Sequence, residues 1–300
     1  MWHRRWVTTA LAALAAITTF GTAAASPVQV AATTTNMAML AQEIGGPHVE
    51  VVTMAPPDRD VHYLEARPSM MAALRRADLV VSVGAELEEG WLPAALRGAS
   101  NPAVMPGRPG YFEAVAHVDL IGHAAPDRGQ GDVHPAGNPH IYLDPVRTAQ
   151  VAHALAGRLA ELAPEHRETF QNNAARFEAT VDKRLPRWQE MAASAPGVLL
   201  FHEDMDYLME RLGIPIHGYL EPLPGIPPTA RHLRQLVRDL QDRQGATLFT
   251  DFQPAGGARF IQRELGWNYH ALPTHVPVGG DADDYFDTID AIVWAATGAR

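Results

Sequence analysis

Three histidines are the strongest candidates for a chemical role in this 300-residue sequence. His62 lies in a turn rich in Pro and Asp, between a β-like run and a helix. His140 lies where a polar loop gives way to a long helical segment, and His202 directly follows the apolar run VLLF. α/β folds usually keep their binding groups on such connections. Because zinc favours imidazole nitrogen, three imidazoles from separate segments predict a metal site.

Each histidine also has a purely structural interpretation. His62 fits an exposed loop residue, and His202 fits a strand-end residue packed in the core. Since the sequence contains 14 histidines, three in loops are also compatible with chance. His117, His123 and His134 flank or occupy the polar loop, and we interpret them as solvated loop residues, with weak accessory metal contacts as the alternative. The shared placement of His62, His140 and His202 beside one presumed cleft favours the metal site.

A carboxylate is the expected fourth ligand, and three aspartates are candidates. Asp251 ends the run TLFT and is alternatively a group that orients a ligand histidine from outside the coordination sphere. Asp283 alternatively begins the last helix, whose positive end favours acidic side chains. Asp281 follows two glycines that let the backbone approach closely, and we select it. The predicted metal ligands are therefore His62, His140, His202 and Asp281.

Alternating strands and helices must position these residues. Before the polar loop, the pattern predicts strands at 28–34, 49–54 and 79–83, and helices at 37–44, from Ser69 onward, and at 87–96. Ser69 is the expected cap of its helix, and Asp144 with Pro145 is the expected start of the next helical region. After a long helix at 165–193, the apolar runs VLLF, IPIHGYL and TLFT alternate with helices again.

This alternation predicts an α/β fold with two lobes, each with a mostly parallel sheet, joined by one long helix. The expected divisions are an N-terminal lobe at 26–164, a linking helix at 165–195 and a C-terminal lobe at 196–300. A ligand would bind in the cleft between the lobes, at the carboxyl ends of the strands.

The first 25 residues predict an export signal. Arg4 and Arg5 precede an uncharged apolar run, and the alanines at 23–25 suit cleavage after Ala25. We therefore expect a soluble, exported protein in the periplasm. The absence of cysteine excludes disulfides and a lipid-anchored cysteine, and leaves only nitrogen and oxygen donors for a metal. A net charge of −10 argues against nucleic acid as a partner.

Five segments carry a family resemblance across nearly all of the chain after the signal. They are DRDVHYLEARPSMMAALRRADLVVSVGAELEEGWL, NPHIYLDP, FHEDMDYLMERLGI, YLEPLPGIPPTARHL and LFTDFQP. Together they resemble the zinc- and manganese-binding solute receptors of bacterial ABC importers, the TroA-like or cluster A-I family. The resemblance implies two α/β lobes joined by a rigid helix, with metal held between them by His62, His140 and His202. Manganese members tend to carry a carboxylate at the third position, so His202 favours zinc.

Two features depart from the family pattern. The His-rich loop of many zinc receptors is reduced here to His123 and His134. The aspartate that closes the site in several members falls on Val276, so Asp281 would have to reach in from the following loop.

The expected function is a periplasmic receptor, not an enzyme, that captures Zn(II) and delivers it to an inner-membrane ABC permease. We expect a monomer, with a periplasmic metallochaperone as a further candidate partner. A manganese or iron receptor of the same family is the nearest alternative. A zinc hydrolase with an open coordination position is another, although the sequence contains neither HExxH nor G-x-S-x-G. A metallochaperone or adhesin with the same fold is the third.

Overall fold

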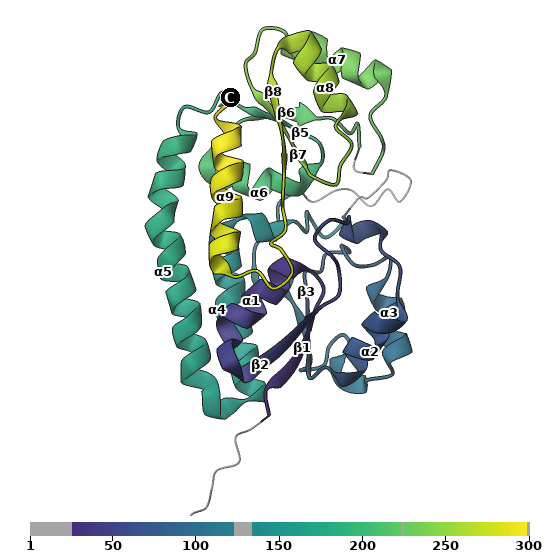
Figure 1. Ribbon diagram of the computed structural model, residues 1–300, viewed down its shortest axis with the longest axis vertical. Helices are drawn as coiled ribbons and strands as arrows, with labels where there is room; N and C mark the ends of the chain where they lie inside the picture. The colour runs from purple at the N-terminus through teal and green to yellow at the C-terminus, as the bar shows by residue number, and fades with distance from the viewer. Residues whose placement is uncertain (1–25, 123–133, 224, 299–300) are drawn as a thin grey trace, which may run out of the picture.

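The computed structural model describes residues 26–122, 134–223 and 225–298. These residues form two four-stranded sheets, each flanked by helices, one above the other in Figure 1. The expected export signal lies outside the described residues. Among the helices of the described part, none is long and apolar enough to cross a membrane.

The first sheet has the strand order β2-β1-β3-β4, and all of its strand pairs are parallel. Its strands are β1 (Val28–Ala32), β2 (Val49–Thr53), β3 (Leu79–Ser82) and β4 (Tyr111–Glu113). The helices between them are α1 (Thr35–Gly45), α2 (Pro68–Arg76) and α3 (Leu92–Ala99). Every residue of β3 is buried, as its β-branched run predicted.

The second sheet repeats this order as β6-β5-β7-β8, again entirely parallel. Its strands are β5 (Val198–Leu200), β6 (Ile216–Tyr219), β7 (Ala246–Thr250) and β8 (Asn268–Leu272). The helices between them are α6 (Asp206–Leu212), α7 (Ala230–Leu240) and α8 (Gly256–Leu265). Two parallel α/β sheets confirm the predicted fold class. In both sheets the order reverses beside the first strand, which is where such folds bind ligands.

Three long helices run alongside the two sheets (Figure 1). They are α4 (Pro145–Leu162), α5 (Arg167–Ala192) and α9 (Ala282–Ala296). The buried face of α5 includes Phe170, Phe177 and Trp188, which recur at the helical spacing seen in the sequence. One hydrophobic core continues from Val30 in the first sheet to Leu248 in the second. The proposed boundaries at residues 164 and 195 stay predictions.

Buried hydrogen bonds also hold the two lobes together. Asn36, on α1, donates from Nδ2 to the carbonyl of Thr274 at 2.9 Å and accepts from the N–H of Val276 at 3.0 Å. The hydroxyl of Tyr207, on α6, donates to the carbonyl of Asn138 at 2.6 Å. Since breaking such contacts would leave buried polar groups unpaired, these hydrogen bonds stabilise this arrangement of the lobes.

The structure corrects two predicted helix starts. Ser69 is not the cap of α2, because the helix begins one residue earlier at Pro68, whose fixed φ suits the first position and which has no N–H to satisfy. The helix expected at 87–96 begins only at Leu92. Residues 85–91 form a turn before it, in which Ala85 and Glu86 have left-handed φ of 47° and 63°.

A buried carboxylate explains this turn. Glu88 accepts hydrogen bonds from the hydroxyl of Thr33 at 2.6 Å and from the backbone N–H groups of Val83 and Gly84 at 2.8 and 3.0 Å. It thereby ties the carboxyl ends of β1 and β3 to the start of α3. Three residues on, the indole N–H of Trp91 donates to the carbonyl of Val61 at 3.1 Å, which fixes the turn that carries His62.

Candidate metal centre

The structure brings the three predicted histidines together between the lobes. One ring nitrogen from each of His62, His140 and His202 lies within 4.8 Å of the other two. His62 belongs to a single helical turn (Val61–Tyr63), His140 precedes the turn Ile141–Leu143, and His202 follows β5. His140 is 1% exposed and His202 8%. Such a group of convergent imidazoles is suited to bind a transition metal.

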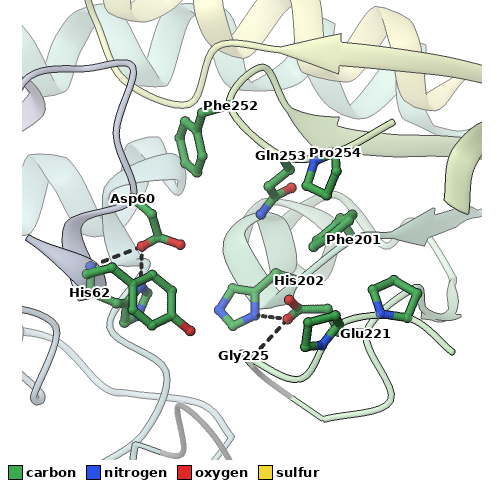
Figure 2. A pocket seen from close by; sticks show the side chains of 12 residues that line it. Asp60, His62, Phe201, His202, Glu221, Gly225, Phe252, Gln253 and Pro254 are labelled. Carbon is green, nitrogen blue, oxygen red and sulfur yellow. Dashed lines mark hydrogen bonds and ion pairs between the residues drawn. The ribbon is translucent and has the colours of Figure 1, made fainter. Parts of the chain in front are cut away.

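Each ring is oriented by an oxygen that its Nδ1 contacts. The pairs are His62 with Asp60 at 2.7 Å, His140 with Asn138 at 2.8 Å, and His202 with Glu221 at 3.0 Å. Figure 2 shows the first and third pairs on opposite walls of one pocket. Because these oxygens accept, the proton of each neutral ring resides on Nδ1, and Nε2 keeps the lone pair that a metal needs.

Two of these partners follow one local pattern. Asp60 and Asn138 each precede a histidine by two residues, and each also accepts the backbone N–H of that histidine, at 3.0 and 2.8 Å. This pattern, an Asp or Asn two residues before His, is visible in the sequence and was missed. Glu221 follows β6 and is 19 residues from His202, so only the fold brings it there.

Charge at the site differs between the two most buried rings. Burial, together with the neighbouring His202 and His62, holds the pKa of His140 well below its usual value, so its lone pair stays available. Burial also lowers the pKa of His202, but the Glu221 bond and the nearby Asp204 outweigh it and raise the pKa to about 9. A metal therefore competes with a proton at His202 Nε2.

A further carboxylate and a further imidazole border the three histidines. Asp204 is 8% exposed, and its Oδ1 lies 3.7 Å from Nε2 of His140. His134, which we interpreted as a solvated loop residue, is also only 8% exposed, and its Nε2 lies 3.1 Å from Nε2 of His62. The solvated interpretation of His134 is therefore wrong, because the turn that carries it folds onto the site.

The structure does not bring Asp281 to the three histidines. Its Oδ1 accepts from the N–H groups of Asp283 and Asp284, and the side chain of Asp284 accepts from the N–H of Asp281 in return. This reciprocal capping satisfies the free N–H groups at the start of α9. Asp251 and Asp283 are exposed and outside the histidine group as well. The choice of Asp281 as fourth ligand is therefore unsupported.

His62 and His202 line a cavity of about 440 Å³ between the lobes (Figure 2). Its lining includes Asp60, His62, His202, Glu221 and Phe252. Two of these residues are acidic, so the cavity attracts cations toward the imidazoles. Two of the three histidines therefore face this opening, and His140 lies buried behind them.

We predict that Glu221→Gln lowers metal affinity by about 10- to 100-fold, because the neutral amide holds and polarises His202 less well than a carboxylate. The measurement is competitive zinc titration of the metal-free protein. Glu178→Gln is the matched control, since Glu178 contacts His153 at 2.8 Å on the surface. Equal affinities for the two variants would contradict the role of Glu221.

The carboxyl group of Asp206 makes the stability of the folded protein depend on pH. The hydroxyl of Tyr219 donates to its Oδ2 at 2.8 Å, but burial and the nearby Glu203 raise its pKa to about 7. Between about pH 4 and 7 the folded protein therefore binds a proton that the unfolded chain has lost, so stability falls as pH rises through this window. We predict that Asp206→Asn is more stable than wild type near pH 8 and loses this advantage near pH 5. The test is urea unfolding of the metal-free protein at both pH values, with Asp242→Asn, an exposed position, as the control. An equal difference in unfolding free energy between Asp206→Asn and wild type at the two pH values would contradict the prediction.

Two parallel α/β lobes that hold converging histidines in their cleft define a class, the metal-binding solute receptors. The family model described as zinc-uptake complex component A, periplasmic, matches residues 30–295, and the chain belongs to this family. It is therefore an extracytoplasmic metal-binding protein of the type that serves ABC importers.

Individual relatives differ in the metal that their names state. The high-affinity zinc uptake system protein ZnuA of Yersinia pestis is 27% identical over 222 residues, 67% of this chain and 69% of that protein. The manganese-binding lipoprotein MntA of Bacillus subtilis is 24% identical over 243 residues, 77% and 73% of the two chains. A crystal structure of ZnuA has a TM-score of 0.75 at 20% identity, covering 90% of this chain and 100% of the other. That likeness supports the fold alone.

Proposed function

We propose that this protein is a periplasmic receptor that captures Zn(II) with His62, His140 and His202 and delivers it to an inner-membrane ABC permease. The supporting observation is that one ring nitrogen of each histidine lies within 4.8 Å of the other two, while each Nδ1 contacts its own oxygen. A preformed site of this kind binds without first having to orient its ligands.

The donor atoms favour zinc over manganese. Imidazole nitrogen suits zinc, whereas manganese prefers carboxylate and carbonyl oxygen. Asp60 and Glu221 contact histidine Nδ1 atoms, and so act on the metal through the rings rather than as ligands. We propose further that the protein has no enzymatic role, works as a monomer, and is exported without a lipid anchor after cleavage at Ala25. A periplasmic metallochaperone is a further proposed partner.

Competitive titration of metal-free protein with Zn(II) and Mn(II) against a chromophoric chelator tests the choice of metal. We expect one tight zinc equivalent that Mn(II) in roughly 100-fold excess does not displace, consistent with the affinity order of divalent metals. A protein that binds no zinc tightly would contradict the proposal. A protein from which manganese displaces zinc would support a manganese receptor instead.

A further inference from the structure

Three imidazoles leave one position of a tetrahedral zinc ion to be filled. The structure places a fourth imidazole beside them. Nε2 of His134 is 3.1 Å from Nε2 of His62, and its ring centroid is 5.2 Å from that of His62 and 6.2 Å from that of His140. With its side chain in the cleft, His134 is 8% exposed.

We propose that His134 is the fourth ligand of the zinc site, an inference that rests on the proposed function. Two nitrogens bound to one tetrahedral zinc at 2.0–2.1 Å lie about 3.3 Å apart, close to the distance between His134 and His62 in the structure. The two Nε2 atoms therefore already stand at nearly the separation that a shared metal ion requires.

The protonation of the pair is compatible with this role. If Asp60 accepts the Nδ1 proton of a neutral His62, Nε2 of His62 carries a lone pair, to which a neutral His134 can donate from Nε2–H across the 3.1 Å contact. Zinc takes the place of that proton between the two rings. The proton moves to Nδ1 of His134, so both rings stay neutral and both Nε2 lone pairs face the metal.

The local chain presents His134 to the site from a tight turn. The N–H of Gly137 donates to the carbonyl of His134 at 3.0 Å, and the N–H of Asn138 donates to the carbonyl of Ile121 at 2.8 Å. Gly137 has a φ of +119°, and a Cβ there would lie 2.8 Å from Cβ of Leu120. This short segment ends at Asn138, whose side chain orients His140. One turn therefore positions both His134 and His140.

Asp204 is a competing candidate. Its Oδ1 is 3.7 Å from Nε2 of His140, but its Oδ2 already accepts a hydrogen bond from Gln253 at 3.0 Å. With four neutral rings, the zinc charge of +2 is balanced by the carboxylates of Asp60 and Glu221, which contact ligand rings directly.

Two measurements test the proposal: zinc titration and the visible spectrum of the Co(II)-loaded protein. Both are compared among wild type, His134→Ala, Asp204→Asn and the surface control His153→Ala. We expect His134→Ala to lose about 100-fold in zinc affinity and to change the cobalt spectrum, which reports the number and type of ligands. Asp204→Asn and His153→Ala should keep the wild-type spectrum.

The possible failures are distinguishable. A wild type without a tight zinc site would overturn the proposed function together with this inference. Tight binding by wild type, with unchanged affinity and cobalt spectrum in His134→Ala, would overturn the fourth ligand alone. A spectrum altered by Asp204→Asn but not by His134→Ala would assign the position to Asp204.

Discussion

Replacing His140 with alanine is expected to weaken zinc binding by roughly 1,000-fold or more, beyond the 10- to 100-fold typical of losing a partner outside the coordination sphere. Burial and the neighbouring His202 and His62 hold the pKa of His140 well below its usual value, which keeps its lone pair free at neutral pH. It is also the least exposed of the three histidines, so water replaces it poorly as a ligand.

Competitive titration measures this effect, and His48→Ala is the control. His48 stacks on His166 at 3.6 Å between ring centroids, outside the histidine group, so its loss should leave zinc affinity unchanged. Thermal unfolding of the metal-free variants separates loss of a ligand from loss of the fold. A His140→Ala protein that folds and binds zinc within about tenfold of wild type would show that His140 is at most an orienting residue.

Asp144→Ala is expected to cost about 3–5 kcal/mol of unfolding free energy, the largest effect on stability that we predict. Asp144 is fully buried and accepts hydrogen bonds from Arg147 at 2.6 Å and from Arg211 at 2.8 Å. It also caps α4 by accepting from the N–H of Val146 at 3.0 Å. Removing the carboxylate leaves two guanidinium groups without their shared partner and an N-terminus without its cap.

Urea unfolding of the metal-free protein tests this value. The control is Glu161→Ala, which removes an exposed ion pair with Arg158 at 3.2 Å and should cost under about 1 kcal/mol. If both variants lost the same small amount, the buried cluster around Asp144 would not be the stabilising feature that its geometry indicates. A large loss confined to Asp144→Ala would support it.

The sequence predicted the three histidines because each stands on a connection at the edge of a recognisable strand or helix. It also predicted α4 from Asp144 and Pro145, and the buried face of α5 from its periodic apolar residues. The strands β4 and β8 were missed, since β4 has three residues and β8 carries the polar sequence NYHAL without a clear alternation.

The role of Asp281 could not be predicted from the sequence because a metal site and a helix cap favour the same residue type. An aspartate after glycines suits a metal site and also a helix cap. The carboxylate of Asp281 accepts hydrogen bonds from N–H groups at the start of α9. His134 was misjudged for a related reason. A polar loop predicts exposure, but the turn at Gly137 returns the chain to the cleft, and that tertiary contact leaves no periodic pattern in the sequence.

Anomalous X-ray diffraction at the zinc edge, from crystals of the zinc-loaded protein, would locate the bound ion. We expect one strong peak in the cleft between the lobes, about 2.0–2.1 Å from the Nε2 atoms of His62, His140 and His202. A zinc peak elsewhere on the molecule, with no density between these three nitrogens, would contradict it.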